Sequence, residues 1–207
     1  GFSVMRVAMG LSILALVGML GMIFFHAWPA LSWDFLTEAP RNMMSEGGIW
    51  PCLVGTFLLA AGALVIALPL GVVSAVYLNE YNLDSPLMTI IRLSVANLAG
   101  VPSIIFGLFG LTFFVVFCDF GVSLLSGILT LAVLSLPIII NTTETALKQV
   151  PQDWREASLA LGATRFETIF KVILPNALPG ILTGAILALA RAAGETAALM
   201  YTGTVFF

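Results

Sequence analysis

The chain has 207 residues, of which 60% are hydrophobic and only 9% are charged. Water-soluble domains carry about 25% charged residues, so this composition excludes an ordinary soluble fold and indicates a protein that lies in a lipid bilayer. The formal net charge of -3 offers no basic surface, which excludes nucleic acid as a partner.

Uncharged runs long enough to cross a bilayer follow one another along the chain. A helix rises 1.5 Å per residue and needs about 20 residues to cross about 30 Å of hydrocarbon. Backbone polar groups in lipid must pair within their own segment, and the runs lack the alternation of a β-barrel, so we predict helices. The predicted spans are Val7–Phe25, Cys52–Leu78, Leu93–Cys118, Phe120–Thr143 and a fifth that begins at Val172.

The basic residues predict how these spans are oriented. An inside N-terminus leaves Arg41 as the one cation of the outer segments, and this positive-inside bias predicts a cytoplasmic N-terminus. We expect residues 1–50 to form an N-terminal helix with an outer loop, and residues 51–207 to form the main transmembrane domain. The cations of the inner segments are Arg6, Arg92, Lys148, Arg155, Arg165 and Lys171.

The third predicted span contains two residues that weaken a helix, Gly100 and Pro102. A proline inside a membrane helix removes one backbone hydrogen bond and exposes carbonyl groups. The result is either unwound backbone at a substrate site, with Ser103 as a donor, or a packing kink. The link to the fourth span, around Asp119, is very short, so we predict that these two spans form an antiparallel hairpin.

A polar segment on the inner side, Glu144–Lys171, carries clear helix signals. Asp153-x-x-Glu156 and Thr164-x-x-Glu167 both read as capping boxes, and Gly162 between them is typical of a helix end. We predict a cytoplasmic elbow over residues 144–175, made of two short helices that end at Gly162 and Pro175. The alternative is an interfacial loop packed on its own bundle. The apolar contact surface of the predicted elbow would consist of Trp154, Ala157, Leu161, Phe166 and Phe170.

Two charges interrupt the fifth span, Arg191 and Glu195. They are four residues apart, which predicts that they share one face of a helix. An unpaired arginine at mid-membrane costs at least about 2.5–3.5 kcal/mol, so it must face a partner, a cavity or the bundle interior. One reading is a translocation pathway, in which the planar guanidinium binds an oxyanion and Glu195 holds Arg191 between transport events. The other is a static ion pair that fixes packing.

The sequence lacks patterns for nucleotide binding, catalysis and metal binding. It contains no phosphate-binding loop of the Gly-x-x-x-x-Gly-Lys-Ser/Thr type, so we expect no bound ATP or other cofactor and an energy source in a partner protein. The single His26 and the dispersed Cys52 and Cys118 form neither a catalytic set nor a metal-binding pattern. We therefore expect no catalytic residues and no metal site.

The elbow resembles the EAA motif of the permease subunits of ABC importers. That motif is Glu-Ala-Ala, three residues, Gly, nine residues, Ile, one residue and Leu-Pro. The chain has Glu156-Ala157-Ser158, then Gly162, then Val172-x-Leu174-Pro175 at the same spacing, with Ser158 and Val172 as departures. The resemblance implies an all-α polytopic bundle of the MetI-like, type I importer class. It also implies that Glu156 and Ala157 dock on a cytoplasmic ATPase and that Gly162 supplies the turn.

Three further segments are similar to the PstA family of phosphate permease subunits. They are Gly100–Gly110, Tyr77–Tyr81 and Ala190–Thr196, and the likeness runs from about residue 47 to about residue 204. The resemblance implies ATP-driven import of inorganic phosphate across a bacterial cytoplasmic membrane, in which the ATP is used by a partner. The implied partners are an ATPase dimer, a second PstC-like permease subunit, an extracytoplasmic phosphate-binding protein and the lipid bilayer.

Alternatives to phosphate import remain open at this point. One alternative is a permease for another oxyanion, such as sulfate or molybdate. A second is a secondary transporter driven by an ion gradient, with Glu195 as its proton site. A membrane scaffold or sensor without transport activity is the third alternative. Only 32 residues follow Pro175, where the family usually has two spans. We therefore expect five spans here and a sixth outside this chain, which we expect to be a fragment.

Overall fold

The computed structural model describes residues 2–41, 46–81 and 86–203. The regular elements among these residues are helices, apart from one short hairpin, which confirms the predicted all-α class. The chain separates into two compact units, residues 1–54 and residues 55–207. Each unit is described by itself.

The first unit is a long helix followed by small elements. Helix α1 spans Phe2–Ala27, and none of its described side chains is buried, so this all-apolar helix needs lipid or a partner helix around it. After it come the 3-10 turn η1 (Trp28–Ala30), α2 (Trp33–Thr37) and the antiparallel strands β1 (Pro40–Arg41) and β2 (Glu46–Gly47). The Oγ atom of Ser32 caps α2 by accepting a hydrogen bond from the backbone N–H of Phe35 at 3.1 Å.

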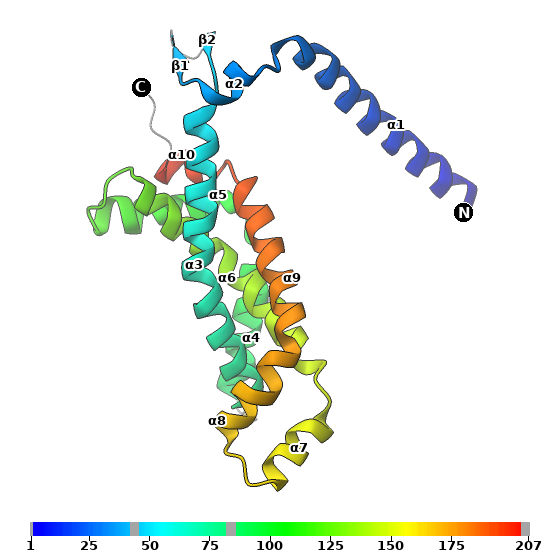
Figure 1. The fold of residues 1–207 in the computed structure, drawn as a ribbon, viewed down its shortest axis with the longest axis vertical. Helices are drawn as coiled ribbons and strands as arrows, with labels where there is room; N and C mark the ends of the chain where they lie inside the picture. The colour runs from blue at the N-terminus through cyan, green and yellow to red at the C-terminus, as the bar shows by residue number, and fades with distance from the viewer. Residues whose placement is uncertain (1, 42–45, 82–85, 204–207) are drawn as a thin grey trace. The chain divides into compact units, whose positions relative to one another are not determined.

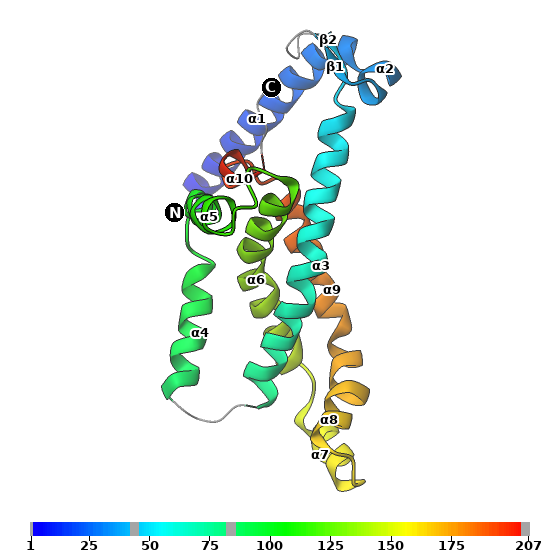
Figure 2. The same cartoon turned by 90° about the vertical axis from the view of Figure 1, so that its left-hand side faces the viewer.

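The second unit is a bundle of apolar helices, with different short helices at its two ends. Figures 1 and 2 show α3, α6 and α9 running alongside one another, with α7 and α8 at one end and α5 and α10 toward the other. The elements are α3 (Trp50–Glu80, which starts in the first unit), α4 (Pro86–Leu98), α5 (Ser103–Gly110), the π-helix η2 (Leu111–Phe117), α6 (Leu124–Lys148), α7 (Gln152–Ala160), α8 (Arg165–Thr168), the π-helix η3 (Ile169–Ile173), α9 (Leu174–Ala193) and α10 (Leu199–Thr202).

Small residues let the central helices approach closely. Buried alanines of α3 and α9 pack against large aliphatic side chains of α6, such as Leu131 and Ile139. Along the contact of α6 with α9, the backbone of Gly184 lies against Thr142, and Gly180 lies against Ala146. Apolar side chains gain nothing by leaving lipid, so such close backbone packing is the main attraction between membrane helices.

The third predicted span is wrong as a single helix. The structure divides it into α4 and the helix Ser103–Phe117, and the two are bent by 102° relative to each other. Helix α4 ends in turns that bond Gly100 N–H to Asn97 and Val101 N–H to Leu98, and Pro102 then starts α5 with an extended ψ of 137°. Because α5 lies across the bundle (Figure 2), the predicted antiparallel hairpin with the fourth span is wrong as well.

The last span is longer than predicted and includes part of the elbow. An unbroken helix of 29 residues runs from Arg165 to Ala193, so the second elbow helix does not end at Pro175. The π-helical segment η3 precedes Pro175, which lies in the first turn of α9, where a missing N–H is tolerated. The predicted fourth span likewise extends beyond Thr143, because Glu144 and Lys148 belong to α6. By length and composition, four helices can cross a membrane in the described residues, or five if the bent pair is one span.

Candidate functional site

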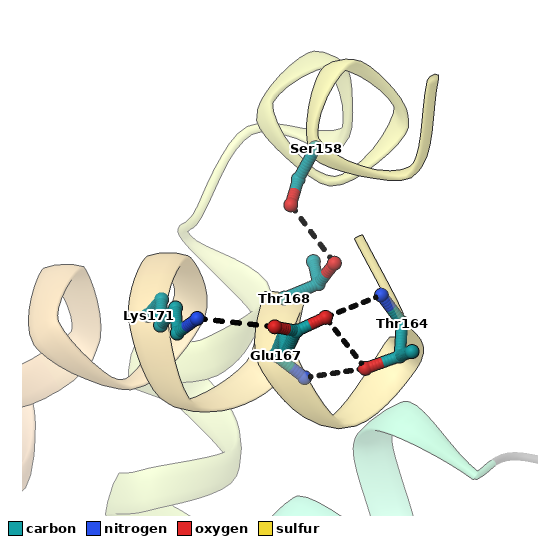
Figure 3. Close-up of polar contacts among 5 residues, drawn as sticks. All are labelled: Ser158, Thr164, Glu167, Thr168 and Lys171. Carbon is teal, nitrogen blue, oxygen red and sulfur yellow. Dashed lines mark hydrogen bonds and ion pairs between the residues drawn. The ribbon is translucent and has the colours of Figure 1, made fainter. Parts of the chain in front are cut away.

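The elbow turns at the glycine that the sequence indicated. Gly162 has a φ of +85°, a backbone conformation that side chains disfavour, and it separates α7 from α8. The second predicted capping box is confirmed (Figure 3). Thr164 Oγ1 accepts from the backbone N–H of Glu167 at 3.2 Å, and Glu167 Oε2 accepts from the backbone N–H of Thr164 at 3.0 Å. Lys171 adds an ion pair to Glu167 at 3.1 Å.

The first predicted capping box is wrong. Helix α7 has Pro151 at its N-cap position, with no side-chain cap, and begins at Gln152. Proline sets the extended backbone that leads into the helix, so Asp153 falls within the first turn. There its negative charge is favourable beside the helix N-terminus, although it caps no N–H group.

One departure from the EAA pattern has a structural explanation. Ser158, which replaces the second alanine, places its Oγ atom 2.9 Å from Oγ1 of Thr168 (Figure 3). Thr168 is buried at the end of α8. The two hydroxyl groups therefore join α7 to α8 across the Gly162 turn, which makes the elbow one unit.

The elbow has apolar side chains that are exposed rather than packed against the bundle. None of the residues of α7 is buried. Leu161 is 90% exposed and Phe166 is 62% exposed, and Glu156 and Ala157 are exposed beside them. A rimmed apolar surface of this kind is typical of a contact site for another protein.

Arg155 attaches the elbow to the bundle, although its place in the sequence indicated only a cation of the cytoplasmic side. Arg155 Nη1 lies 2.6 Å from Glu80 Oε1, at the end of α3, and its Nη2 donates to the carbonyl of Leu147 in α6 at 2.6 Å. The partners are 75 and 8 residues away in sequence, so a single sequence holds no direct sign of this contact. The one signal was the position of Glu80, a charge at the end of an apolar span.

The structure does not pair the two charges of the predicted pathway. Helix α9 ends at Ala193, with Gly194 as its C-cap, so Glu195 lies beyond the helix and the predicted shared helical face is wrong. Glu195 Oε1 instead accepts from the backbone N–H of Ala198 at 3.3 Å. Arg191 is exposed in the last turn of α9, and its side chain has no hydrogen-bond or ion-pair partner among the described residues.

The predicted helix break lies at the same end of the bundle as α10. Gly100 and Pro102 are in the non-helical link, and Ser103 is the half-buried first residue of α5. Helix α5 packs closely on the α10 region, because a side-chain carbon at Gly107 would lie 2.8 Å from the Cα atom of Ala198. Within residues 86–203, no hydrogen bond joins Ser103 to Arg191, so the structure brings these candidates to one end of the bundle but not into one site.

An open pocket lies beside the elbow. It has a volume of about 330 Å³ and lies where α3, α7 and η3 meet. Its lining combines the polar side chains of Asn79, Glu80, Arg155 and Arg165 with the apolar side chains of Ile169 and Ile173. In the described part of the chain, no group of three or more His, Cys, Asp or Glu residues is placed to hold a metal ion.

The sequence pattern of one family matches most of this helical unit. The family is described as "Binding-protein-dependent transport system inner membrane component", and the match covers residues 67–205, which include α4 to α10 and the whole elbow. The chain belongs to this family. Multi-pass insertion in an inner membrane is thereby established for the chain, and the elbow is part of the family's shared region.

Named relatives of this permease family span nearly the whole chain. It is 39% identical over 187 residues to the "Probable ABC transporter permease protein YqgI" of Bacillus subtilis, covering 90% of this chain and 64% of the relative. It is 39% identical over 177 residues to the "Phosphate transport system permease protein PstA 2" of Mycobacterium tuberculosis, covering 86% and 58%. It is 37% identical over 174 residues to the "Phosphate transport system permease protein PstA" of Xylella fastidiosa, covering 84% and 61%.

A solved permease-family structure has a similar fold. A chain of the MetNI methionine ABC transporter, in an inward-facing conformation, is 31% identical to this chain with a TM-score of 0.61. The match covers 75% of this chain and 73% of that one. The chain spans 58–64% of the length of the curated relatives named above.

Proposed function

We propose that this chain is part of the membrane-spanning subunit of an ATP-driven importer that carries inorganic phosphate across the cytoplasmic membrane. The family membership supports an importer that works with a separate binding protein. The substrate is supported by relatives at 37–39% identity whose names specify phosphate transport. An amino acid such as methionine is a second candidate substrate, because the similar solved fold belongs to a methionine transporter.

The single observation that carries the coupling role is the exposed apolar side of the elbow. Leu161 and Phe166 are well exposed, while Arg155 and the Ser158–Thr168 contact hold the elbow in one conformation. A preorganised apolar surface loses little entropy when a partner docks on it. We infer that a cytoplasmic ATPase dimer docks here through Glu156 and Ala157, with Gly162 as the turn, and that ATP is used by that partner.

We place the substrate pathway near the end of α9 opposite the elbow. Arg191 is 17 residues beyond the start of α9, or about 25 Å along the helix. Its guanidinium is exposed and has five donors suited to phosphate oxygens. A divalent anion needs more positive charge than one arginine, so a second PstC-like permease subunit is expected to supply another cation. Ser103, after the break at Gly100 and Pro102, is an additional candidate donor.

The proposed orientation has the N-terminus and the elbow in the cytoplasm. Five cations of the second unit lie in or beside the elbow end: Arg92, Lys148, Arg155, Arg165 and Lys171. Cations at one end of a bundle favour a cytoplasmic location for that end. An extracytoplasmic phosphate-binding protein would then deliver substrate to the opposite end.

Labelled-phosphate uptake tests this proposal in cells that carry the full-length protein and its partners. Excess sulfate or molybdate serves as competitor, and wild type is compared with Arg191→Gln. We expect phosphate-selective uptake that is lost in the variant while the complex stays assembled. Arg41→Gln is the matched control, because Arg41 is a largely exposed cation of the first unit.

Each of the other results removes one part of the proposal. Competition by sulfate or molybdate would assign the importer to another oxyanion. Unchanged uptake in Arg191→Gln would remove the pathway assignment, and a complex that falls apart would make Arg191 a packing residue. Uptake without any ATPase subunit would favour the secondary transporter.

A further inference from the structure

The polar attachment of α7 to the membrane helices depends on one side chain. In the part of the chain that the structure describes, two α7 side chains make polar contacts outside α7, those of Arg155 and Ser158. The partner of Ser158 is Thr168, which belongs to the elbow itself. Arg155 is therefore the polar connection from α7 to α3 and α6.

The geometry of Arg155 suits a rigid link. One guanidinium nitrogen bonds Glu80 Oε1 at 2.6 Å, and the other bonds the Leu147 carbonyl at 2.6 Å. A planar fork holds two acceptors in fixed directions, which a lysine ammonium does not. The side chains of Arg155 and Glu80 are 15% and 10% exposed, so water screens this ion pair little. Asn79 Nδ2 donates to the same Glu80 oxygen at 2.7 Å and fixes its position.

We propose that Arg155 and Glu80 form a clamp that transmits displacement of the elbow to the end of α3. This inference rests on the proposed coupling function. Glu80 is the last residue of α3, a helix of 31 residues that packs through buried alanines against α6 and α9. A force applied to α7 at the clamp therefore acts on the end of a long helix, rather than on a loop.

The clamp complements a second connection between the elbow and the membrane. Helices α8, η3 and α9 form one continuous helix, so the distal half of the elbow moves with α9. Helix α7 has no such continuity, because Gly162 separates it from α8 and residues Gln149–Pro151 separate it from α6. Without the clamp, the Ser158–Thr168 contact would still join α7 to α8, but no polar contact would join α7 to α3. Docking of a partner would then move α7 without moving α3.

The test uses alanine variants of both residues in the full complex with its ATPase and second permease subunit. Spin labels at Asp153→Cys on α7 and Tyr81→Cys after α3 report the distance across the clamp, in a Cys52→Ser/Cys118→Ser background. We expect Arg155→Ala and Glu80→Ala each to broaden the distance distribution and to raise the ATP hydrolysed per phosphate transported by roughly fivefold or more. The double variant should be no worse than the more damaging single variant, because one unpaired buried charge is worse than none.

Two controls separate the clamp from a general loss of structure. Arg165→Gln removes an exposed cation beside the same pocket and should leave both readouts unchanged. Arg155→Lys keeps the charge without the fork and should still broaden the distance distribution.

The outcomes distinguish the clamp from the proposed transport function. A distance distribution that is unchanged in Arg155→Ala, or additive damage in the double variant, would overturn the clamp. A changed distance with an unchanged ATP-to-phosphate ratio would overturn its coupling role. If the wild-type complex hydrolyses ATP but carries no phosphate, the proposed substrate fails, while the label distance still reports on the clamp.

Discussion

Arg92 of α4 lies with its Nε atom 3.5 Å from Oε1 of Glu144 in α6. The same glutamate oxygen is 2.7 Å from the ammonium group of Lys148, and Arg92 Nη2 donates to the carbonyl of Leu78 in α3 at 2.6 Å. Arg92 thus bridges three helices at the elbow end of the bundle. Glu144 is only 12% exposed, so its charge depends on these two cations for compensation.

Replacing Glu144 should lower the stability of the second unit. Glu144→Ala leaves Arg92 without its carboxylate, and Arg92 is 32% exposed, so water restores part of the loss. We expect the free energy of unfolding to fall by about 1–2 kcal/mol, measured as a lower thermal midpoint in detergent. The control is Lys171→Ala, which removes a pair whose lysine is 72% exposed and should cost about 0.5 kcal/mol or less. Equal losses in the two variants would show that burial of Glu144 does not matter.

Local signals in the sequence predicted the elements that depend on near neighbours. The apolar runs that became α1, α3 and α6 were found because length alone decides a membrane helix. Thr164 and Glu167 are three residues apart, so their capping box is visible without any tertiary structure. Gly162 was found for the same reason, since a left-handed turn after a helix favours glycine.

Features that depend on geometry or on distant partners were not predictable in this way. The 102° bend lies within one uncharged run, and hydropathy does not indicate where the helix axis changes direction. Pro175 reads as a helix end, yet the π-helical segment before it lets the helix continue. The Arg155–Glu80 contact joins residues 75 positions apart, and only folding brings them together. Glu195 was misplaced because α9 ends two residues earlier, at Ala193.

Substitutions at Gly162 should affect binding of the ATPase subunits according to the backbone preference of the new residue, rather than its size. Nothing lies within 4 Å of a side-chain carbon at this position, but its φ is +85°. Asparagine tolerates the left-handed region, whereas a β-branched residue does not. We expect Gly162→Asn to keep near-normal binding of the ATPase subunits and Gly162→Val to weaken it several-fold, as measured by co-purification of the complex. Ala160→Val, at the end of α7, is the control for the added bulk.

The contact between α6 and α9 is so close that even one added methyl group should destabilise the bundle. A side-chain carbon at Gly184 would collide with Oγ1 of Thr142. We expect Gly184→Ala to destabilise the bundle by about 1–3 kcal/mol, because α6 and α9 would have to separate. Thr142→Ala in the same chain should recover part of this loss, because Oγ1 is removed while the Cβ atom of residue 142, 2.9 Å from the added carbon, remains. Thermal unfolding of the single and double variants would show this. Gly55→Ala, with nothing within 4 Å, should be neutral. A double variant that remains as unstable as Gly184→Ala would place the cause elsewhere.

Reversing the charge of Glu156 should separate ATP hydrolysis from transport without unfolding the chain. Glu156 is exposed on α7, and its side chain has no hydrogen-bond or ion-pair partner among the described residues, so the thermal midpoint of the isolated chain should stay within error. The proposed docking surface would instead present a lysine to the ATPase, which should lower phosphate uptake by roughly tenfold or more while hydrolysis continues. Paired assays of uptake and phosphate release from ATP measure both. Glu38→Lys, a comparable reversal in the first unit, is the control. Normal uptake by Glu156→Lys would remove this residue from the docking surface and leave the apolar side chains around Leu161 to account for coupling.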